Sequence, residues 1–372
     1  MMRVAFVARY LQMVNHHKVI ALAAQPGIDL WHIAPRRWKD NFRVYEQELK
    51  QGQDYRLLIA DLFPLRSDIH RFIYWPPTLF LNRIRPDILH IEEEPDSLAA
   101  LQAGWARRLW SPRAKLILFS WQNIRRKRRA AVEQIARFVL RRVDHAIAGN
   151  HGAADVLRQQ GYLGPITVLP QLGVDTSVFQ PRDGTALRDE LQLGHFVIGY
   201  VGRFVPEKGL EVLIEAAARV PGCHVLLIGR GPMQAEIESL ATARGLQNRL
   251  TIIPPVPHHD VARYFNAMDV LVLPSRTTPV WQEQFGHVLI EAMACGLPVI
   301  GSDSGAIPEV IGAAGLIFPE NDVNALTDQL RRLEQDRDTL RRLSQLGLER
   351  VSAHYTHERI AEQTLRVYRS VL

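Results

Sequence analysis

The sequence predicts an α/β protein with two doubly wound, Rossmann-like domains that face a central crevice. Its 372 residues exceed the size at which one hydrophobic core stops growing, so two domains are expected. Short apolar runs alternate with longer segments of helical spacing, which is typical of βαβ units and a parallel sheet. A stretch rich in proline, glycine and aspartate, PQLGVDTSVFQPRDG, separates two such series and marks the join between the domains.

The apolar runs that we expect to form strands fall on either side of this join. In the first series they are residues 3–8, 29–35, 55–60, 87–92, 115–120, 145–149 and 166–170. In the second they are residues 196–202, 224–229, 250–255, 270–275, 298–303 and 314–319. We therefore expect an N-terminal domain over residues 1–175 and a C-terminal domain over residues 176–355. Residues 356–372 should form a C-terminal helix that packs back toward the N-terminal domain.

The composition limits the class of protein. Apolar residues make up 47% of the chain, yet no window approaches the run of about 18 apolar residues that a membrane-spanning helix requires. Arg3 and Arg9 interrupt the N-terminal apolar run and no small-residue cleavage site follows, which favours a first strand over a signal peptide. Cys223 and Cys295 show no partner spacing, so we expect buried free thiols and a cytoplasmic location.

The positive charge is concentrated in the first half of the chain. Residues 1–190 hold 28 Lys and Arg against 19 Asp and Glu, whereas the remainder holds 17 against 20. The excess is greatest from Arg125 to Arg142, where Arg125 to Arg129 precede an apolar pattern of helical spacing. We interpret this stretch as a basic amphipathic helix, and a solvated face and contact with an anionic membrane both stay open. No nucleic-acid fold motif accompanies it, so we expect no nucleic-acid partner.

A loop with two cations follows the first strand of the second domain. In GRFVPEKG, Gly202 permits a tight turn, while Arg203 and Lys208 precede a helix N-terminus. Backbone N–H groups and the helix dipole favour an anion there, and two cations add charge-assisted bonds, so the arrangement suits a diphosphate. The alternative is a surface turn in which Lys208 pairs with Glu207 or Glu211.

Two further loops end neighbouring strands of the same domain. In GRGP, Gly229 and Gly231 permit a base or phosphate to approach closely, although a plain turn explains them equally well. In EQFGHVLIEAMA, Glu283 precedes Gly286 in an expected loop, and Glu291 lies five residues further, in an expected helix. The simpler interpretation makes Glu291 a solvated helix residue and has the helix dipole favour Glu283 by about 0.3 to 1 kcal/mol.

Polar residues also follow strands of the first domain, and we expect them to line a pocket. These residues are His90, Glu92 and Glu94, which alternation places on one side of an extended chain, and Gln122 and Asn123 at the next strand end. A metal site is less favoured at His90, because a second well-spaced ligand is missing. The same argument applies to His258 and His259.

The ordered motifs of the second half resemble a known family. The run GRFVPEKG, then IGRGP, then EQFGHVLIEAMACGLPVIGSDSGAIPEVIG, with GVDTSVFQP before them, is similar to the retaining GT-B glycosyltransferases of the group 1 family, also called family 4. The resemblance covers residues 170–320, and the first domain resembles the family more loosely. It implies a GT-B fold with an N-terminal acceptor-binding domain and a C-terminal nucleotide-sugar-binding domain.

The resemblance also implies roles for individual residues. Arg203 and Lys208 match the basic pair that neutralises the donor diphosphate, Glu291 matches the residue that binds the ribose hydroxyls, and Glu283 matches the residue near the transferred sugar. The positions implied to lie around the donor's base, phosphates and sugar are Gly202, Gly229, Gly231, Phe285, Gly286, His287 and Val288. Two departures concern the first domain: no glycine pair follows its first strand, and Gln122 and Asn123 stand where many members have a histidine.

The resemblance implies a hexosyltransferase-type enzyme, EC 2.4, that retains the anomeric configuration. Its partners would be a nucleotide diphosphate sugar and a glycan or lipid-linked acceptor from polysaccharide biosynthesis, with peripheral contact at the inner face of the membrane. We expect no cofactor and no metal, because Arg203, Lys208 and a helix N-terminus supply the positive charge. The alternatives are a nucleotide-sugar epimerase on the same scaffold and a non-catalytic membrane or nucleic-acid binding module.

Overall fold

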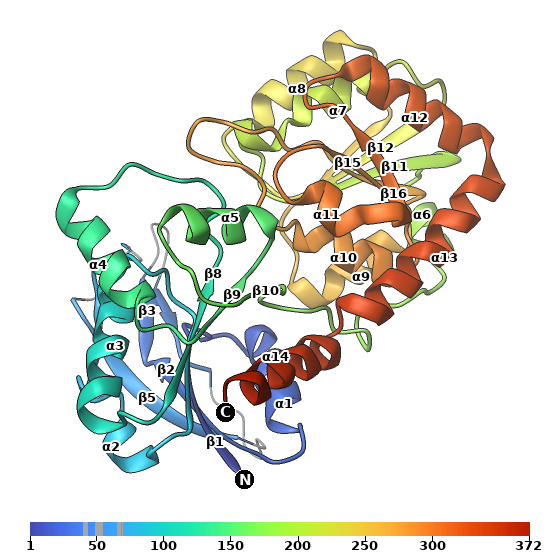
Figure 1. Ribbon diagram of the computed structural model, residues 1–372. Helices are drawn as coiled ribbons and strands as arrows, with labels where there is room; N and C mark the ends of the chain where they lie inside the picture. Colours follow the sequence, from blue (N-terminus) through green and yellow to red (C-terminus); the bar gives the residue numbers. More distant parts are fainter. Residues whose placement is uncertain (40–43, 49–54, 65–67, 69) are drawn as a thin grey trace. The chain divides into compact units, whose positions relative to one another are not determined.

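A computed structural model describes residues 1–39, 44–48, 55–64, 68 and 70–372 of the chain (Figure 1). The chain divides into two compact units. Unit 1 comprises Met1–Gly173 together with His357–Leu372, and unit 2 comprises Val174–Thr356. The boundaries predicted from the sequence were residues 175 and 356. Among the described helices, none combines the length and apolar composition needed to cross a bilayer.

Unit 1 is built on an eight-stranded sheet with the order β10-β9-β8-β7-β1-β2-β5-β6. All neighbouring strands pair in parallel except β5 and β6, which are antiparallel. The strands are β1 Met2–Val7, β2 Ile28–Pro35, β5 Arg56–Phe63, β6 Ile73–Trp75, β7 Ile88–Ile91, β8 Lys115–Ser120, β9 His145–Ala148 and β10 Ile166–Val168. A separate antiparallel pair joins β3 Arg37–Lys39 to β4 Val44–Glu46.

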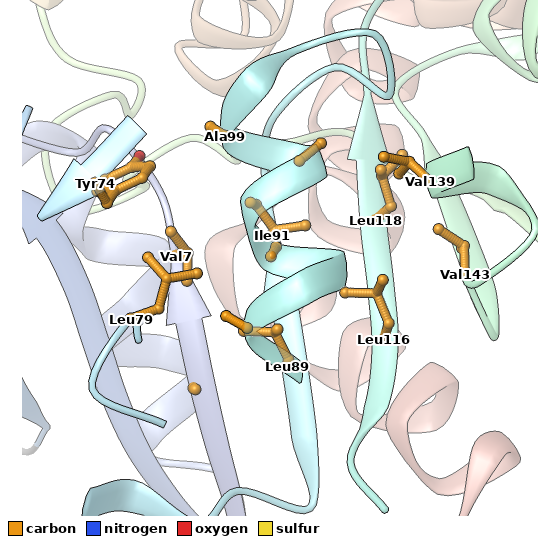
Figure 2. Close-up of a cluster of buried hydrophobic side chains, with 14 of the residues drawn as sticks. Val7, Tyr74, Leu79, Leu89, Ile91, Ala99, Leu116, Leu118, Val139 and Val143 are labelled. Atoms are coloured by element: carbon orange, nitrogen blue, oxygen red, sulfur yellow. The ribbon is translucent and has the colours of Figure 1, made fainter. Parts of the chain in front are cut away.

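Helices cover both faces of this sheet and enclose two cores. They are α1 Met13–Ala23, α2 Leu81–Ile84, α3 Leu98–Trp110, α4 Ala130–Leu140, α5 His151–Gln159 and α14 His357–Val371. Figure 2 shows the core beneath α3, a buried cluster that includes Val7, Leu89 and Leu116 of the strands and Ala99 of the helix. The core on the opposite face includes Phe6 of β1 and Tyr368 of α14. The last helix of the chain is therefore part of the unit-1 core.

Unit 2 contains a six-stranded parallel sheet with the order β13-β12-β11-β14-β15-β16. The strands are β11 Phe196–Val201, β12 Cys223–Ile228, β13 Leu250–Ile253, β14 Val270–Leu273, β15 Val299–Ser302 and β16 Gly315–Phe318. The α-helices are α6 Thr185–Glu190, α7 Leu210–Ala217, α8 Gln234–Ala243, α9 Val261–Phe265, α10 His287–Ala294, α11 Ile307–Ile311, α12 Val323–Gln335 and α13 Arg337–His354. Short 3₁₀ helices are η1 Pro206–Lys208, η2 His258–Asp260 and η3 Gly312–Ala314.

The predicted fold class is confirmed, and every predicted apolar run contains a strand. The strands that the sequence did not predict are β3, β4 and β6, each of three residues. Such short edge segments lack the length over which periodicity is recognisable. Both cysteines are buried free thiols, as predicted, and burial raises the pKa of Cys223 to about 11 and that of Cys295 to about 12.

The predicted basic helix is wrong in its first turn. Helix α4 begins at Ala130, and Arg125 to Arg129 lie in the loop that precedes it. The positive end of a helix dipole disfavours a run of cations at this point, which explains why the helix starts after the run. Within the loop, Arg125 pairs with Glu133 at 3.0 Å and Arg128 with Asp96 at 3.0 Å. Part of the charge therefore stabilises unit 1 itself.

Candidate functional site

The strand order of unit 2 creates a switch point between β11 and β14. Successive connections run to opposite sides of the sheet there, which separates the loops at the carboxyl ends of these two strands. Lys208 lies in the loop after β11, and Ser275 and Glu283 lie in the segment after β14. The residues predicted from GRFVPEKG and EQFG therefore meet at the position where open α/β sheets bind ligands.

The centre of this site is the ion pair between Lys208 and Glu283. Nζ of Lys208 lies 2.5 Å from Oε2 of Glu283, and the Ser275 hydroxyl donates to the same oxygen at 2.8 Å. The lysine ammonium also lies 5.0 Å from the ring centroid of Trp281. Because an ammonium group has three donors, Lys208 can hold Glu283 and an anion at once. The predicted alternatives for Lys208, Glu207 and Glu211, are not its partners, and Glu211 pairs with Arg276.

The backbone at Glu283 is fixed by the loop after β15. The Glu283 carbonyl accepts a hydrogen bond from the N–H of Ala306 at 3.0 Å. Gly305 has a φ of +54°, and a Cβ there would lie 2.1 Å from the same carbonyl oxygen. Only glycine permits this approach without a shift of the backbone. The loop containing Gly305 is therefore a support for Glu283.

Arg203 is the exposed cation of the site. Its carbonyl accepts a hydrogen bond from the Tyr200 hydroxyl at 2.9 Å, which fixes the backbone of the loop. Within the described residues, no carboxylate forms an ion pair with its guanidinium. An exposed guanidinium near the Lys208 loop is suited to an anionic ligand, because its planar fork matches phosphate oxygens.

The glycines of GRGP have a packing function that the sequence did not predict. A Cβ at Gly229 would lie 1.9 Å from the Gly202 carbonyl oxygen, and one at Gly231 would lie 2.2 Å from the Phe204 carbonyl oxygen. The backbone of the β11 loop thus occupies the space that side chains would need. This close packing of two loops explains both glycines without any ligand.

Helix α10 carries the second glutamate and starts at the predicted glycine. Gly286 is its N-cap with a φ of +78°, and Glu291 lies in the second turn of the helix. Oε1 of Glu291 lies 2.8 Å from Nε2 of His258. His287 and Val288 form the first turn and are half-buried. Phe285 is buried against Tyr355, with ring centroids 5.7 Å apart, so its contacts are with the protein core.

Two of the polar residues predicted to line a pocket in unit 1, His90 and Glu92, are buried in its interior. His90 is 0% exposed, and its Nδ1 lies 2.7 Å from the Tyr368 hydroxyl, so the prediction that it lines a pocket is wrong. Burial lowers the pKa of His90 well below its ordinary value, which keeps the ring neutral. The strand in which it lies is covered by α14, an element that is distant in sequence.

The three glutamates after β7 have protein partners. Glu92 accepts hydrogen bonds from Lys18, Tyr10 and Gln171, and Glu94 accepts them from the Ser120 hydroxyl at 2.6 Å and the Trp121 N–H at 2.9 Å. Glu93, which was not among the predicted pocket residues, pairs with Arg9 at 2.9 Å. Burial raises the pKa of Glu93, and the Arg9 guanidinium opposes that shift. These carboxylates form an internal network.

Gln122 and Asn123 follow β8 and are half-buried. Asn123 packs near Gly152 of α5, where an added Cβ would lie 3.3 Å from the asparagine Cβ. Glu94 is half-buried as well, so these three are the predicted unit-1 residues that remain partly accessible. Among the described residues, no three His, Cys, Asp or Glu side chains are grouped to hold a metal ion, and His258 and His259 contact Glu291 and Asp260 instead.

Ser275, Arg276 and His258 are parts of this site that the sequence did not predict. Ser275 is the last residue of a predicted strand, so its position gave a usable signal. Arg276 donates to the Pro206 carbonyl at 2.6 Å and thereby ties the β14 loop to the loop carrying Lys208. His258 was considered only as a metal ligand, and nothing local indicates its contact with a glutamate 33 residues away.

Sequence comparisons place the site within a known domain. Residues 186–350 match the family model described as glycosyl transferases group 1. D-Inositol 3-phosphate glycosyltransferases from Mycobacteroides abscessus and Mycobacterium tuberculosis are each 34% identical over 171 residues. These matches cover 43% of this chain, 37% of the first relative and 34% of the second, so the similarity spans little more than a third of the curated relatives.

Structural comparisons extend the similarity of fold to the whole chain. Sucrose-phosphate synthase from Thermosynechococcus elongatus has a TM-score of 0.74 at 24% identity, covering 100% of this chain and 99% of its own. HepE from Anabaena, solved in complex with UDP, has a TM-score of 0.77 at 19% identity, covering 100% of both chains. The chain therefore has a GT-B fold, and its residues 186–350 are similar to the glycosyl transferases group 1 family.

Proposed function

We propose that this protein is a hexosyltransferase that moves a sugar from a nucleotide diphosphate sugar to an acceptor with retention of configuration. The observation that carries the proposal is the ion pair of Lys208 and Glu283 beside the exposed Arg203, at the switch point of a group 1 domain. It provides two cations for a diphosphate and a carboxylate for a sugar hydroxyl within one group of loops. Anabaena HepE, which is similar in fold, has also been solved in complex with UDP-glucose.

The proposed reaction breaks the bond between the anomeric carbon and the diphosphate oxygen and forms one to an acceptor oxygen. Arg203, Lys208 and the N-terminal amides of α10 stabilise the negative charge that develops on the leaving diphosphate. A leaving phosphate oxygen accepts the proton of the acceptor hydroxyl. Glu283 orients the sugar hydroxyls and Glu291 accepts hydrogen bonds from the ribose. We propose that no metal and no other cofactor takes part.

A panel of nucleotide sugars tests donor binding directly. UDP-, GDP- and ADP-glucose are added to the protein, and thermal unfolding is measured with and without EDTA. We expect one of them to raise Tm equally in both conditions. Loss of the shift in EDTA would contradict the metal-free proposal, and no shift with any donor would contradict donor binding. Product analysis then separates transfer from epimerisation, because an epimerase converts the donor without needing an acceptor.

We further propose that unit 1 binds a glycan or lipid-linked acceptor, as in polysaccharide biosynthesis. The half-buried Gln122 and Asn123 are its candidate contact residues, because they follow β8 and are partly accessible, whereas His90 and Glu92 are buried. Replacing Asn123 with alanine should raise the acceptor KM and leave the donor-induced Tm shift unchanged. An unchanged acceptor KM would remove this residue from the acceptor site.

We also propose that unit 1 contacts an anionic membrane at the cytoplasmic face. One surface of this unit supports the proposal. Trp105 and Leu109 of α3 are exposed by 45% and 61%, and both lie close in sequence to Arg108. Burial and the nearby charges of Arg107, Arg108 and Arg141 lower the pKa of Arg142, which shows that cations gather there. Exposed aromatic and aliphatic side chains beside arginine suit a lipid interface.

Vesicle co-sedimentation tests this surface. Wild-type protein should bind vesicles containing phosphatidylserine, and binding should weaken as salt rises. The double variant Trp105→Ser/Leu109→Ser should lose that binding, whereas Arg126→Gln/Lys127→Gln in the loop before α4 should weaken it less. Equal binding by all three proteins, or no vesicle binding by wild type, would contradict the proposed surface.

A further inference from the structure

We infer that His258 is a positioning residue for Glu291, holding one carboxylate oxygen so that the other faces a nucleotide ribose. This inference rests on the proposed function, because it assigns the structural basis of donor binding within that site. The imidazole Nε2 lies 2.8 Å from Oε1 of Glu291, across 33 positions of sequence. Within the described part of the chain, no donor bonds to Oε2 of Glu291, so that oxygen is available to a ligand.

The histidine is itself fixed by its surroundings. Its ring meets the buried Phe179 edge to face, with centroids 5.1 Å apart, and Phe179 packs in turn against Phe265 of α9. The 3₁₀ helix η2 sets its backbone. The Glu291 side chain is 15% exposed, whereas that of His258 is 49% exposed. The largely buried carboxylate of Glu291 therefore has a partner, His258, whose position is fixed by its neighbours at the edge of the site.

The contact between His258 and Glu291 also affects the net charge beside the donor. A nucleotide diphosphate is an anion, and an ionised Glu291 beside it would repel it. A protonated His258 cancels that charge while Glu291 keeps an acceptor for the ribose hydroxyls. The hydrogen bond to Glu291 raises the pKa of His258, burial opposes that shift, and the carboxylates of Glu291 and Asp175 add to it. On its own helix, His258 is followed by the pair of His259 and Asp260, 3.5 Å apart.

The raised pKa of His258 determines how donor binding should change with pH. A raised pKa keeps His258 charged at and somewhat above its ordinary value of 6.5, and the charge is lost as pH rises through the raised value. Donor binding should therefore be tightest below that pH and weaken above it. A neutral imidazole still donates one hydrogen bond, so the loss should be partial.

The experiment uses the full chain, with the nucleotide sugar of the UDP-, GDP- and ADP-glucose panel that shifts the wild-type Tm most. His258→Ala should raise the donor KM and Kd by roughly 5 to 10-fold with little change in kcat, and remove the rise of KM with increasing pH. His258→Gln, which keeps a donor but cannot titrate, should bind better than His258→Ala and show no such rise. His259→Ala is the matched control and should behave as wild type.

A double-mutant cycle decides whether His258 acts through Glu291. In the Glu291→Ala background, replacing His258 should change the donor Kd by less than about 2-fold, because the carboxylate that it holds is absent. Equal effects in both backgrounds, or a His258→Ala variant that matches His259→Ala, would overturn the inference. Failure of the wild type to bind any nucleotide sugar would instead overturn the proposed function, so the two failures are distinguishable.

Discussion

Each unit contains a lysine–glutamate pair beside its sheet, and the two pairs differ in their access to solvent. In unit 1 the side chains of Lys18 and Glu92 are 2% and 0% exposed, and Tyr10 and Gln171 supply further donors to Glu92. In unit 2 the side chains of Lys208 and Glu283 are 15% and 10% exposed. The same chemistry can therefore serve the interior of one unit and the functional edge of another.

The reason for the difference is what covers each pair. Lys18 belongs to α1, which packs with α14 over one face of the unit-1 sheet. Lys208 belongs to a short 3₁₀ helix between β11 and α7, beside the exposed Arg203. A buried pair must be fully bonded because desolvation is costly, whereas a pair at an accessible edge can exchange partners with a ligand. Burial, more than residue type, therefore separates the Lys18–Glu92 pair of the interior from the Lys208–Glu283 pair that we propose to be functional.

The largest expected effect comes from breaking the buried pair. Lys18→Met leaves Glu92 buried without its cation and should lower the free energy of unfolding by about 3 to 5 kcal/mol. Lys208→Met is the matched change in unit 2 and should cost about 1 kcal/mol, because water can reach the site. Urea unfolding of both variants measures the difference. Equal losses would show that the two pairs contribute equally to stability, whatever their exposure.

The next largest expected effect is on kcat. Here the substitution of Lys208 should matter more than that of Lys18. Lys208→Met removes a cation that we propose to stabilise the leaving diphosphate, so it should lower kcat by about 10² to 10³-fold, as for loss of a preorganised donor. Steady-state kinetics at saturating donor measure this on folded protein. A conservative Lys208→Arg variant should recover part of the rate. If Lys208→Met keeps near-normal kcat, the lysine does not act on the leaving group.

The two glutamates of the donor site should differ from each other. Glu291→Ala removes the proposed ribose contact, which would be made both before and during the reaction, so it should raise the donor KM by roughly 10 to 100-fold, for about 1.5 to 3 kcal/mol. Glu283→Ala should lower kcat and kcat/KM together, because sugar positioning matters most as the glycosidic bond breaks. A purely structural pair would instead lower Tm and leave both constants near normal.

The smallest expected effect is the difference between a substitution in the loop that supports Glu283 and the same substitution in an ordinary turn. Gly305→Ala places a methyl group against the Glu283 carbonyl, whereas a Cβ at Gly245, with a φ of +72°, meets nothing within 4 Å. Both changes carry the strain of positive φ, so the clash alone should cost Gly305→Ala about 1 to 3 kcal/mol more. Gly305→Ala should also lower kcat by displacing Glu283. Identical Tm and kcat in the two variants would show that the loop does not support the carboxylate.

The positions of many residues of the proposed donor site could be predicted because their signals are local. Glu283 and Gly286 lie within four residues of each other, and the loop, the N-cap and the helix that carries Glu291 follow in order along the chain. Strand periodicity is equally local, so the apolar runs predicted the two sheets. The basic run before Ala130 was misassigned because helical spacing in the following residues extended the expected helix beyond its true start.

The sequence by itself determined the α/β class, the two series of strands and the residues that gather after β11 and β14. Only the tertiary structure decided which polar residues are accessible. His90 meets Tyr368 across 278 positions and Glu92 meets Lys18 across 74, so a strand-end pattern that predicted a pocket became part of a core. The contact of Glu291 with His258 likewise joins residues that are distant in sequence. The physical reason is that periodicity and turn chemistry depend on neighbours in sequence, whereas desolvation and hydrogen-bond partners depend on what packs above a residue.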